Sequence, residues 1–371
     1  MLTDEQAYLR ETVRDLLERH AVRATVPAPN EIAAFDGVLW KLMAEQVGLQ
    51  GLAIPEELGG AGAGVIELAQ VFEQMGSVAL NSPFFATVGL AATALMASGH
   101  REICAEYLPR VAAGEAVGTL AMTEAGAGWD GAGIRTTAER SGAEWILNGR
   151  KNYVVDGCAA DFLVVVARVD DRTAVFLVDC PAPGLECVAL NALDPTRPLA
   201  EVTFSRTPAR LICDGDAAWS VIRRTLDRAA VYLAAEQLGG AARCLEMSVD
   251  YAKTRVQFGR PIGSFQAIKH KCADMLVAVE LARSAVWKAA SAASGVEPDC
   301  SASASLAKAV CSDAFVQCAT SAIQIHGGIG FTWEHPAHLY YKRARSSEVL
   351  LGSPAYHRRL LLQHGASELP L

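Results

Sequence analysis

The pattern of apolar residues changes twice along the 371-residue chain, and this change limits the folds that the chain can adopt. Thr3 precedes a run of helical spacing and has Gln6 three positions on, as in a helix-capping box. Further segments with helical spacing lie at residues 38–47, 65–75 and 84–97. We therefore predict that the chain begins with a helical domain.

Short β-favouring runs replace the helical pattern between about residues 117 and 213. They are separated by Gly, Pro, Asn and Asp, which is typical of strands joined by turns. The runs lie at residues 145–147, 162–166, 174–178, 185–190 and 201–204. This part is predicted to form a small, β-barrel-like domain.

Long helical segments return after about residue 217. The expected helices cover residues 217–254, 264–294 and 303–325, with two shorter ones after Glu334 and Ser353. Helices of this length with apolar stripes pack most simply as an antiparallel bundle. The predicted fold class is α+β, with an N-terminal helical domain at 1–115, a middle β domain at 116–215 and a C-terminal four-helix-bundle-type domain at 216–371.

Composition excludes several classes of function. The 33 Lys and Arg are scattered and are outnumbered by 41 Asp and Glu, so nucleic acid is not the expected partner. The chain is 51% hydrophobic, yet no apolar run approaches the roughly 18 residues that span a bilayer, so no membrane span is expected. The ten cysteines and the histidines lack metal-ligand spacing, and the first residues lack a secretory pattern. A cytoplasmic protein without a metal site is predicted.

Three glycine-containing segments carry polar chemistry. Residues 123–130 would let backbone N–H groups approach a ligand closely, although a glycine-rich linker is the alternative. Residues 255–266 form a turn between two long helices, where Arg255 is suited to a diphosphate or is a plain surface arginine. Residues 324–328 offer an amide and a Gly-Gly backbone, or only a helix stop.

Together and in this order, the segments resemble the acyl-CoA dehydrogenase family over essentially the whole chain. The matching motifs are residues 54–60 (IPEELGG), 123–124 (TE), 149–157 (GRKNYVVDG), 255–259 (RVQFG) and 324–328 (QIHGG). The resemblance implies an FAD enzyme with the cofactor held between subunits and an acyl-CoA substrate. It also implies α,β-dehydrogenation, with electrons passing to an electron-transfer flavoprotein.

The resemblance also identifies where the catalytic base of such an enzyme would stand. The two family positions are occupied here by Ala229 and Leu351, and neither side chain is a carboxylate. Two nearby carboxylates are candidate replacements, namely Glu236, two helical turns after Ala229, and Glu348. A carboxylate in a dry pocket would suit this role, because desolvation raises its pKa.

Both candidate carboxylates also have an ordinary structural interpretation. Glu236 would meet a polar group at a helix interface, and Glu348 would pair with Arg345 or Arg343. The sequence favours this interpretation for both, so the catalytic residues of this chain stay unassigned.

The losses in the family pattern fall on one half of the implied site. Tyr153, Val155 and Trp129 replace residues that, by the resemblance, form the flavin-ring wall and the acyl channel. The residues that would reach across to clamp the FAD diphosphate and adenosine of a neighbouring subunit are all present: Arg255, Gln257, Phe258, Gln266, Gln324, Gly327 and Gly328.

This division predicts a catalytically incomplete subunit that works with a homologous, base-bearing partner. It is most similar to the non-basic subunits of heterotetrameric acyl-CoA dehydrogenases of actinobacterial steroid-side-chain degradation, a branch of lipid metabolism. Two alternatives stay open. One is a self-sufficient homomeric enzyme that uses Glu236 or Glu348, and the other is a scaffold subunit that binds no flavin.

Overall fold

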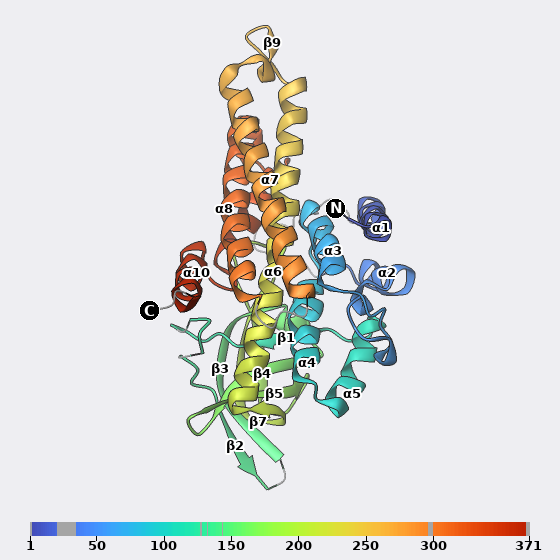
Figure 1. Cartoon of the computed structure of the whole chain (residues 1–371), viewed down its shortest axis with the longest axis vertical. Helices are drawn as coiled ribbons and strands as arrows, with labels where there is room; N and C mark the ends of the chain where they lie inside the picture. Colours follow the sequence, from blue (N-terminus) through green and yellow to red (C-terminus); the bar gives the residue numbers. More distant parts are fainter. Residues whose placement is uncertain are drawn as a thin grey trace. The chain divides into compact units, whose positions relative to one another are not determined.

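The computed structural model describes residues 2–20, 35–126, 128–131, 133–142, 144–295 and 300–368 (Figure 1). All strands of the main sheet lie between Gly118 and Asp214, with helices before and after them. This order confirms the predicted α+β class with a central β part. The domain boundaries at residues 115 and 215 stay predictions. Contacts group the chain into two compact units, one mainly helical and one that contains the sheet.

The helical unit combines Val65–Leu80 and Ala230–Leu371 with the N-terminal helix. Its helices are α1 (Asp4–His20), α3 (Val65–Ser77), the second part of α6 (Gly215–Thr254), α7 (Gln266–Ser294), α8 (Ser301–His326), α9 (Ala337–Val349) and α10 (Pro354–Glu368). A two-stranded hairpin of β8 (Val256–Gln257) and β9 (Arg260–Pro261) joins α6 to the short helix η5 (Ile262–Ser264) and α7. A short helix, η6 (Gly327–Phe331), follows α8.

The N-terminal helix has the cap that its sequence predicts. The Thr3 hydroxyl accepts from the Gln6 backbone N–H at 3.2 Å, and the Gln6 side chain accepts from the Thr3 N–H at 3.0 Å. Helix α6 continues without a break for 40 residues. Even so, none of the helices in the described ranges is both long and apolar enough to cross a membrane.

Helices α3 and α6 cross at two glycines. A Cβ at Gly76 would lie 1.9 Å from the carbonyl oxygen of Glu236, and one at Gly239 would lie 1.8 Å from that of Glu73. Neither distance is compatible with a side chain, so the two backbones approach as closely as they do only because both residues are glycine. The same crossing fixes the backbone positions of Glu73 and Glu236.

The sheet-containing unit consists of Asn30–Gly64 and Asn81–Ala229. Its helices are α2 (Gly37–Val47), η1 (Leu49–Gly51), η2 (Glu56–Leu58), the π-helical η3 (Phe85–Ala92), α4 (Thr93–Ser98), α5 (Arg101–Ala112), η4 (Gly157–Ala159) and the first part of α6. Its strands are β1 (Gly118–Ala121), β2 (Thr137–Ser141), β3 (Glu144–Val155), β4 (Phe162–Val169), β5 (Arg172–Asp179), β6 (Leu185–Leu190) and β7 (Leu199–Asp214).

Five strands close into a ring, which confirms the β-barrel-like prediction. Strand β4 pairs with β2 and with β5, and the ring continues from β2 through β3 and β7 back to β5. Strands β1 and β6 add to the outside of β4 and β7. The interior is filled by small and branched apolar side chains together with Phe176 and Phe204.

Strand β4 is the most completely buried element of the barrel. Every residue from Phe162 to Ala167 is fully buried, which explains its uninterrupted apolar run. Outside the barrel, the ring of Phe162 packs on Tyr107 of α5 and on the backbone of Gly118, where a Cβ would lie 2.2 Å from it.

The sequence patterns missed two strands and one α-helix of this unit. Strand β2 has an exposed, polar sequence, and β1 is only four residues long, so neither shows apolar alternation. Helix α5 contains Pro109, which interrupts a helical pattern; it stands in the last turn, so the helix gives up one backbone hydrogen bond there and ends three residues later.

We expect Gly76→Ala to lower the free energy of unfolding by about 1–3 kcal/mol or more, because the added methyl must separate α3 from α6. Gly37→Ala, at the first residue of α2, is the control, since a Cβ there meets no atom within 4 Å. Thermal unfolding of both variants checks the prediction. Equal melting temperatures would contradict the close approach of the two helices.

Candidate functional site

The hairpin between α6 and α7 presents the first of the predicted binding segments. Its two-residue turn has positive φ at both positions, +54° at Phe258 and +77° at Gly259, as type I′ hairpins require. Phe258 is 89% exposed, and Arg255 and Gln257 are exposed as well. The side chains of this segment therefore face away from the rest of their own unit, at the tip of the helical hairpin in Figure 1.

The second binding segment lies close to the first. The ring of His326, at the end of α8, stacks on Tyr251 in the last turns of α6, with 4.5 Å between ring centroids. Gln324, Gly327 and Gly328, on either side of His326, are exposed. The structure thus brings together two segments that are about 70 residues apart in sequence.

The chemistry of these two segments fits an anionic nucleotide. They offer two guanidinium groups, at Arg255 and Arg260, and several side-chain amides: Gln257, Gln266 and Gln324. A Cβ at Gly328 would meet no atom of this chain within 4 Å, so the backbone there is open to a ligand. Gln266, the first residue of α7, is exposed and lies 3.4 Å from His270.

In the sheet-containing unit, the segment at residues 123–130 is organised by a buried ion pair. The Lys151 ammonium donates to Glu124 at 2.6 Å and to the carbonyl of Met122 at 3.0 Å. Glu124 also accepts from the backbone N–H groups of Arg135 and Thr136. Burial lowers the pKa of Lys151, although the Glu124 carboxylate opposes this shift. The glycine-containing segment is therefore anchored at its start, which the linker alternative does not require.

The three residues that the resemblance places at the flavin-ring wall and the acyl channel, Tyr153, Val155 and Trp129, differ in exposure. Tyr153 stands in an irregular part of β3 with φ of +58° and is 60% exposed. Val155 is buried, and its carbonyl accepts from the Thr119 hydroxyl at 2.6 Å. Trp129 is half-buried in the turn before β2.

Ala229 in α6, which the resemblance matches to the first family position for the base, is completely buried.

The second base position, Leu351, lies in a tightly held turn of the helical unit. Its φ of +60° is in the left-handed region, and Gly352 follows at +104°. Buried Lys308 donates to the carbonyls of Glu348 and Gly352 at 3.2 and 3.1 Å. The Nε2 atom of His357 lies 3.0 Å from the Leu351 carbonyl, so the neutral imidazole carries its proton there. Burial, reinforced by the charge of Lys308, lowers the pKa of His357 to about 4.

Sequence reasoning did not identify Lys308 or His357. The signal for Lys308 was present, because it is the one charged residue in the small, apolar stretch 304–311 (ASLAKAVC). A lysine in such a stretch must either reach solvent or find buried acceptors, and here it finds two carbonyls at the end of α9. His357 has no comparable signal.

The two candidate carboxylates are both engaged in ion pairs. Glu236 is buried and accepts from Arg343 at 2.8 Å, and Arg343 also donates to the carbonyl of Leu80. Glu348 pairs with Arg345 at 2.7 Å on the partly exposed side of α9. Both carboxylates thus have the kind of partner that the structural interpretation expects, and the role of each in catalysis stays a prediction.

Two of the three histidines near the end of α8 have their rings in contact. His326 and His335 have 4.3 Å between centroids, and His338 packs against Trp333. Burial, followed by the electrostatic effect of His326 and His338, lowers the pKa of His335 to about 4. In the ranges that the structure describes, no group of three or more His, Cys, Asp or Glu is placed to hold a metal ion.

Family models match the chain in three consecutive parts. Residues 3–115 match the N-terminal domain of acyl-CoA dehydrogenases, residues 119–207 the middle domain and residues 217–365 the C-terminal domain. The chain therefore belongs to the acyl-CoA dehydrogenase family, oxidoreductases that act on CH–CH bonds. The resemblance seen in the sequence motifs is confirmed.

Two mycobacterial acyl-CoA dehydrogenases are similar to this chain over almost its whole length. Acyl-CoA dehydrogenase IpdE2 of Mycobacterium tuberculosis is 39% identical over 95% of this chain and 94% of its own length. IpdE2 of Mycolicibacterium smegmatis is 36% identical over 97% of this chain and 98% of its own length.

Solved structures of similar proteins have the same fold. A variant of the Tcur3481–Tcur3483 steroid ACAD matches with a TM-score of 0.88 and 32% identity, over 98% of this chain and 99% of its own. The ChsE4–ChsE5 complex from Mycobacterium tuberculosis matches with a TM-score of 0.89 and 28% identity, over 100% and 99%. Butyryl-CoA dehydrogenase from Megasphaera elsdenii gives 0.89 and 27%, over 98% of each chain.

We expect Glu236→Gln to lower the free energy of unfolding by about 3–5 kcal/mol, because it removes the negative charge that pairs with the buried Arg343 guanidinium. Glu348→Gln is the matched control. Its ion pair is partly exposed, so the expected cost is below about 1 kcal/mol. Thermal unfolding of the two variants checks the difference, and equal losses would contradict a structural role specific to Glu236.

Proposed function

We propose that this chain is one subunit of an FAD-dependent acyl-CoA dehydrogenase and contributes the clamp for the FAD diphosphate and adenosine. A homologous partner subunit supplies the catalytic base and completes the site. FAD, when bound, accepts the hydride from the β-carbon of the acyl-CoA thioester. The residues of this chain would hold it: Arg255, Gln257, Phe258, Gln266, Gln324, Gly327 and Gly328.

The observation that carries the proposal is that this chain has the clamp residues of the site but no carboxylate at either family base position. The clamp residues are exposed and two of the segments that bear them lie together at one end of the helical unit. The base positions hold Ala229 and Leu351, and the nearby Glu236 and Glu348 are paired with arginines. A proton acceptor must therefore come from elsewhere, which supports a base-bearing partner.

The same observations weigh against the two alternatives. In a homomeric enzyme, Glu236 or Glu348 would have to break its ion pair with arginine during each turnover. For buried Glu236, this would leave two uncompensated charges away from water. A flavin-free scaffold would have no use for an exposed Phe258 beside Arg255 at the end of a helical hairpin.

The substrate and the partners follow from similar proteins. One similar structure is described as a steroid ACAD and another as a complex of two different chains. On this basis we propose a bulky, steroid-derived acyl-CoA substrate, a heterotetramer with a homologous subunit, and electron-transfer flavoprotein as the acceptor. The proposed place of action is the cytoplasm.

We expect Arg255→Ala to reduce the FAD content of the assembled complex at limiting FAD, because the diphosphate loses a charge-assisted partner worth about 1.5–3 kcal/mol. Lys253→Ala, which removes an exposed cation two residues earlier, should leave the FAD content unchanged. Flavin absorbance relative to protein concentration is the measurement. Full occupancy in Arg255→Ala would refute the clamp assignment.

The proposal also predicts a cofactor count of two FAD per heterotetramer. Each pair of unlike chains builds one site from this clamp and the partner's base half. The reverse site would need Tyr153, Val155 and Trp129 of this chain as its flavin wall. Flavin counting on the co-purified complex checks this number. Four FAD per tetramer, or a yellow and active protein formed by this chain alone, would overturn the half-site proposal.

A further inference from the structure

A polar cleft of about 600 Å³ lies within the helical unit, between α1, α3, α6, α7 and α9. This volume is in the range of small-molecule sites. Most such sites are lined by apolar side chains, whereas this cleft has four arginines on its walls: Arg10, Arg14, Arg243 and Arg283. None of its lining residues belongs to the FAD clamp proposed above.

Two of these arginines already have acidic partners in the cleft wall. Arg283 pairs with Glu73 at 2.7 Å, and Arg243 pairs with Glu246 on its own helix. The remaining acidic side chain of the lining, Glu18, is exposed on α1. The cleft therefore carries four guanidinium groups and three carboxylates.

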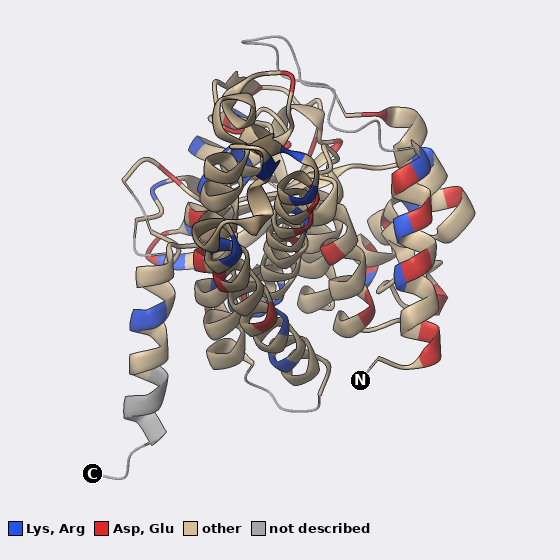
Figure 2. Ribbon diagram, turned by 90° about the horizontal axis from the view of Figure 1, so that it is seen from above, with Lys and Arg blue, Asp and Glu red and all other residues tan. Residues whose placement is uncertain are grey.

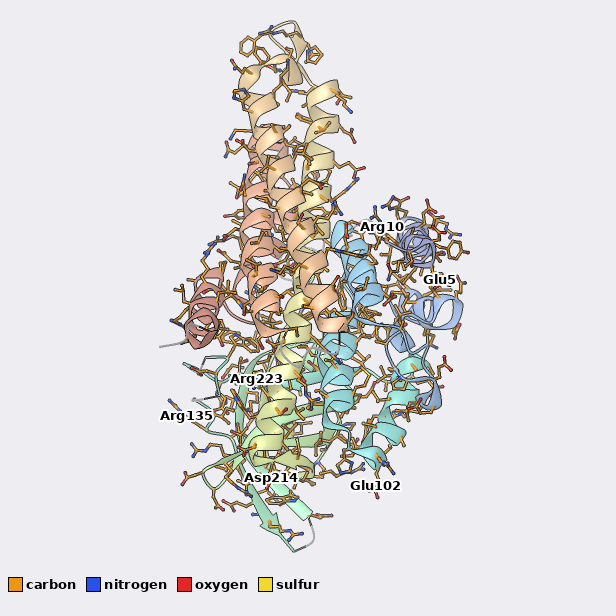
Figure 3. The ribbon with its side chains drawn as sticks, viewed as in Figure 1. Glu5, Arg10, Glu102, Arg135, Asp214 and Arg223 are labelled. Carbon is orange, nitrogen blue, oxygen red and sulfur yellow. The ribbon has the colours of Figure 1, made fainter. Side chains whose placement is uncertain are left out.

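The other two arginines stand on one face of α1. Arg10 and Arg14 are four residues apart, so their side chains are neighbours on the helix surface. Arg14 donates to the neutral side chain of Gln74 at 3.2 Å, which hydrogen-bonds the guanidinium without neutralising it. Figure 3 shows Arg10 on the side of α1 that faces α3.

Arg14 has the opposite charge of Glu18 four residues further along α1, whereas Arg10 has the like charge of Arg14 at the same spacing. Like charges at positions i and i+4 of a helix repel each other and destabilise it. Acidic side chains are plentiful on the rest of α1, as the red residues of the helix nearest the N label in Figure 2 show. An anion between Arg10 and Arg14 would replace the repulsion by two attractive contacts.

We propose that this cleft binds a small molecule with two linked phosphate groups. A planar guanidinium group donates two parallel N–H bonds to the oxygens of a phosphate, and two neighbouring arginines match two adjacent phosphates. Inorganic pyrophosphate and a nucleoside diphosphate share this chemistry. The volume of the cleft leaves room for a nucleoside beside the phosphates.

The test is calorimetric titration of the full-length chain with inorganic pyrophosphate and, separately, with ADP. Both should bind, and Arg10→Gln should weaken binding about tenfold or more, since one charge-assisted phosphate contact is lost. Tighter binding of ADP than of pyrophosphate would assign the site to nucleotides, and equal affinity would assign it to the diphosphate alone. Arg19→Gln, on the same helix but outside the cleft, should bind as the wild type does.

A second measurement separates this cleft from the FAD clamp. Arg255→Ala should keep the pyrophosphate binding that Arg10→Gln weakens, so failure of the clamp assignment would leave this result unaffected. Without ligand, Arg10→Gln should melt at the wild-type temperature or above it, yet lose the rise in melting temperature that pyrophosphate causes. The proposal is wrong if pyrophosphate and ADP do not bind the wild type, if Arg10→Gln binds them normally, or if binding disappears in Arg255→Ala instead.

Discussion

The close crossing of α3 and α6 is the constraint on which the helical unit depends. Gly76 of α3 and Gly239 of α6 each contact a backbone carbonyl of the other helix. Neither helix can therefore rotate or slide without a clash. The carbonyls belong to Glu236 and Glu73, whose side chains reach Arg343 of α9 and Arg283 of α7. The contact between α3 and α6 thereby helps to position two further helices, α9 and α7.

The same crossing holds a carboxylate that lies near one of the family base positions named by the resemblance. Glu236 is a structural residue because its backbone is fixed by Gly76 and its side chain by Arg343. The turn at Leu351 is fixed by different means, through Lys308 and His357. Both regions are rigid, well-bonded parts of the structure, although neither holds the family's carboxylate.

Local patterns in the sequence were sufficient to predict much of the fold. The Thr3 cap, the buried run of β4 and the long helices around the Phe258 turn all have signals within a few residues of themselves. Strand β2 has no such signal, because its pairing with β3 and β4 decides its conformation. The ion pair of Glu236 was foreseen only as a contact with some polar group, because its partner lies 107 residues away.

The aromatic tip of the helical hairpin has a consequence for how this protein is made. Phe258 and Phe331 are 89% and 75% exposed, and Trp333 is 46% exposed, all in or beside the two binding segments. Exposed apolar groups of this kind promote association with unrelated chains when their natural cover is missing. If the proposed assembly forms, any of this chain made in excess over its partner would keep these aromatic groups exposed and would tend to aggregate. Balanced production of the two polypeptides, and their prompt assembly, would then limit the aggregation of this chain.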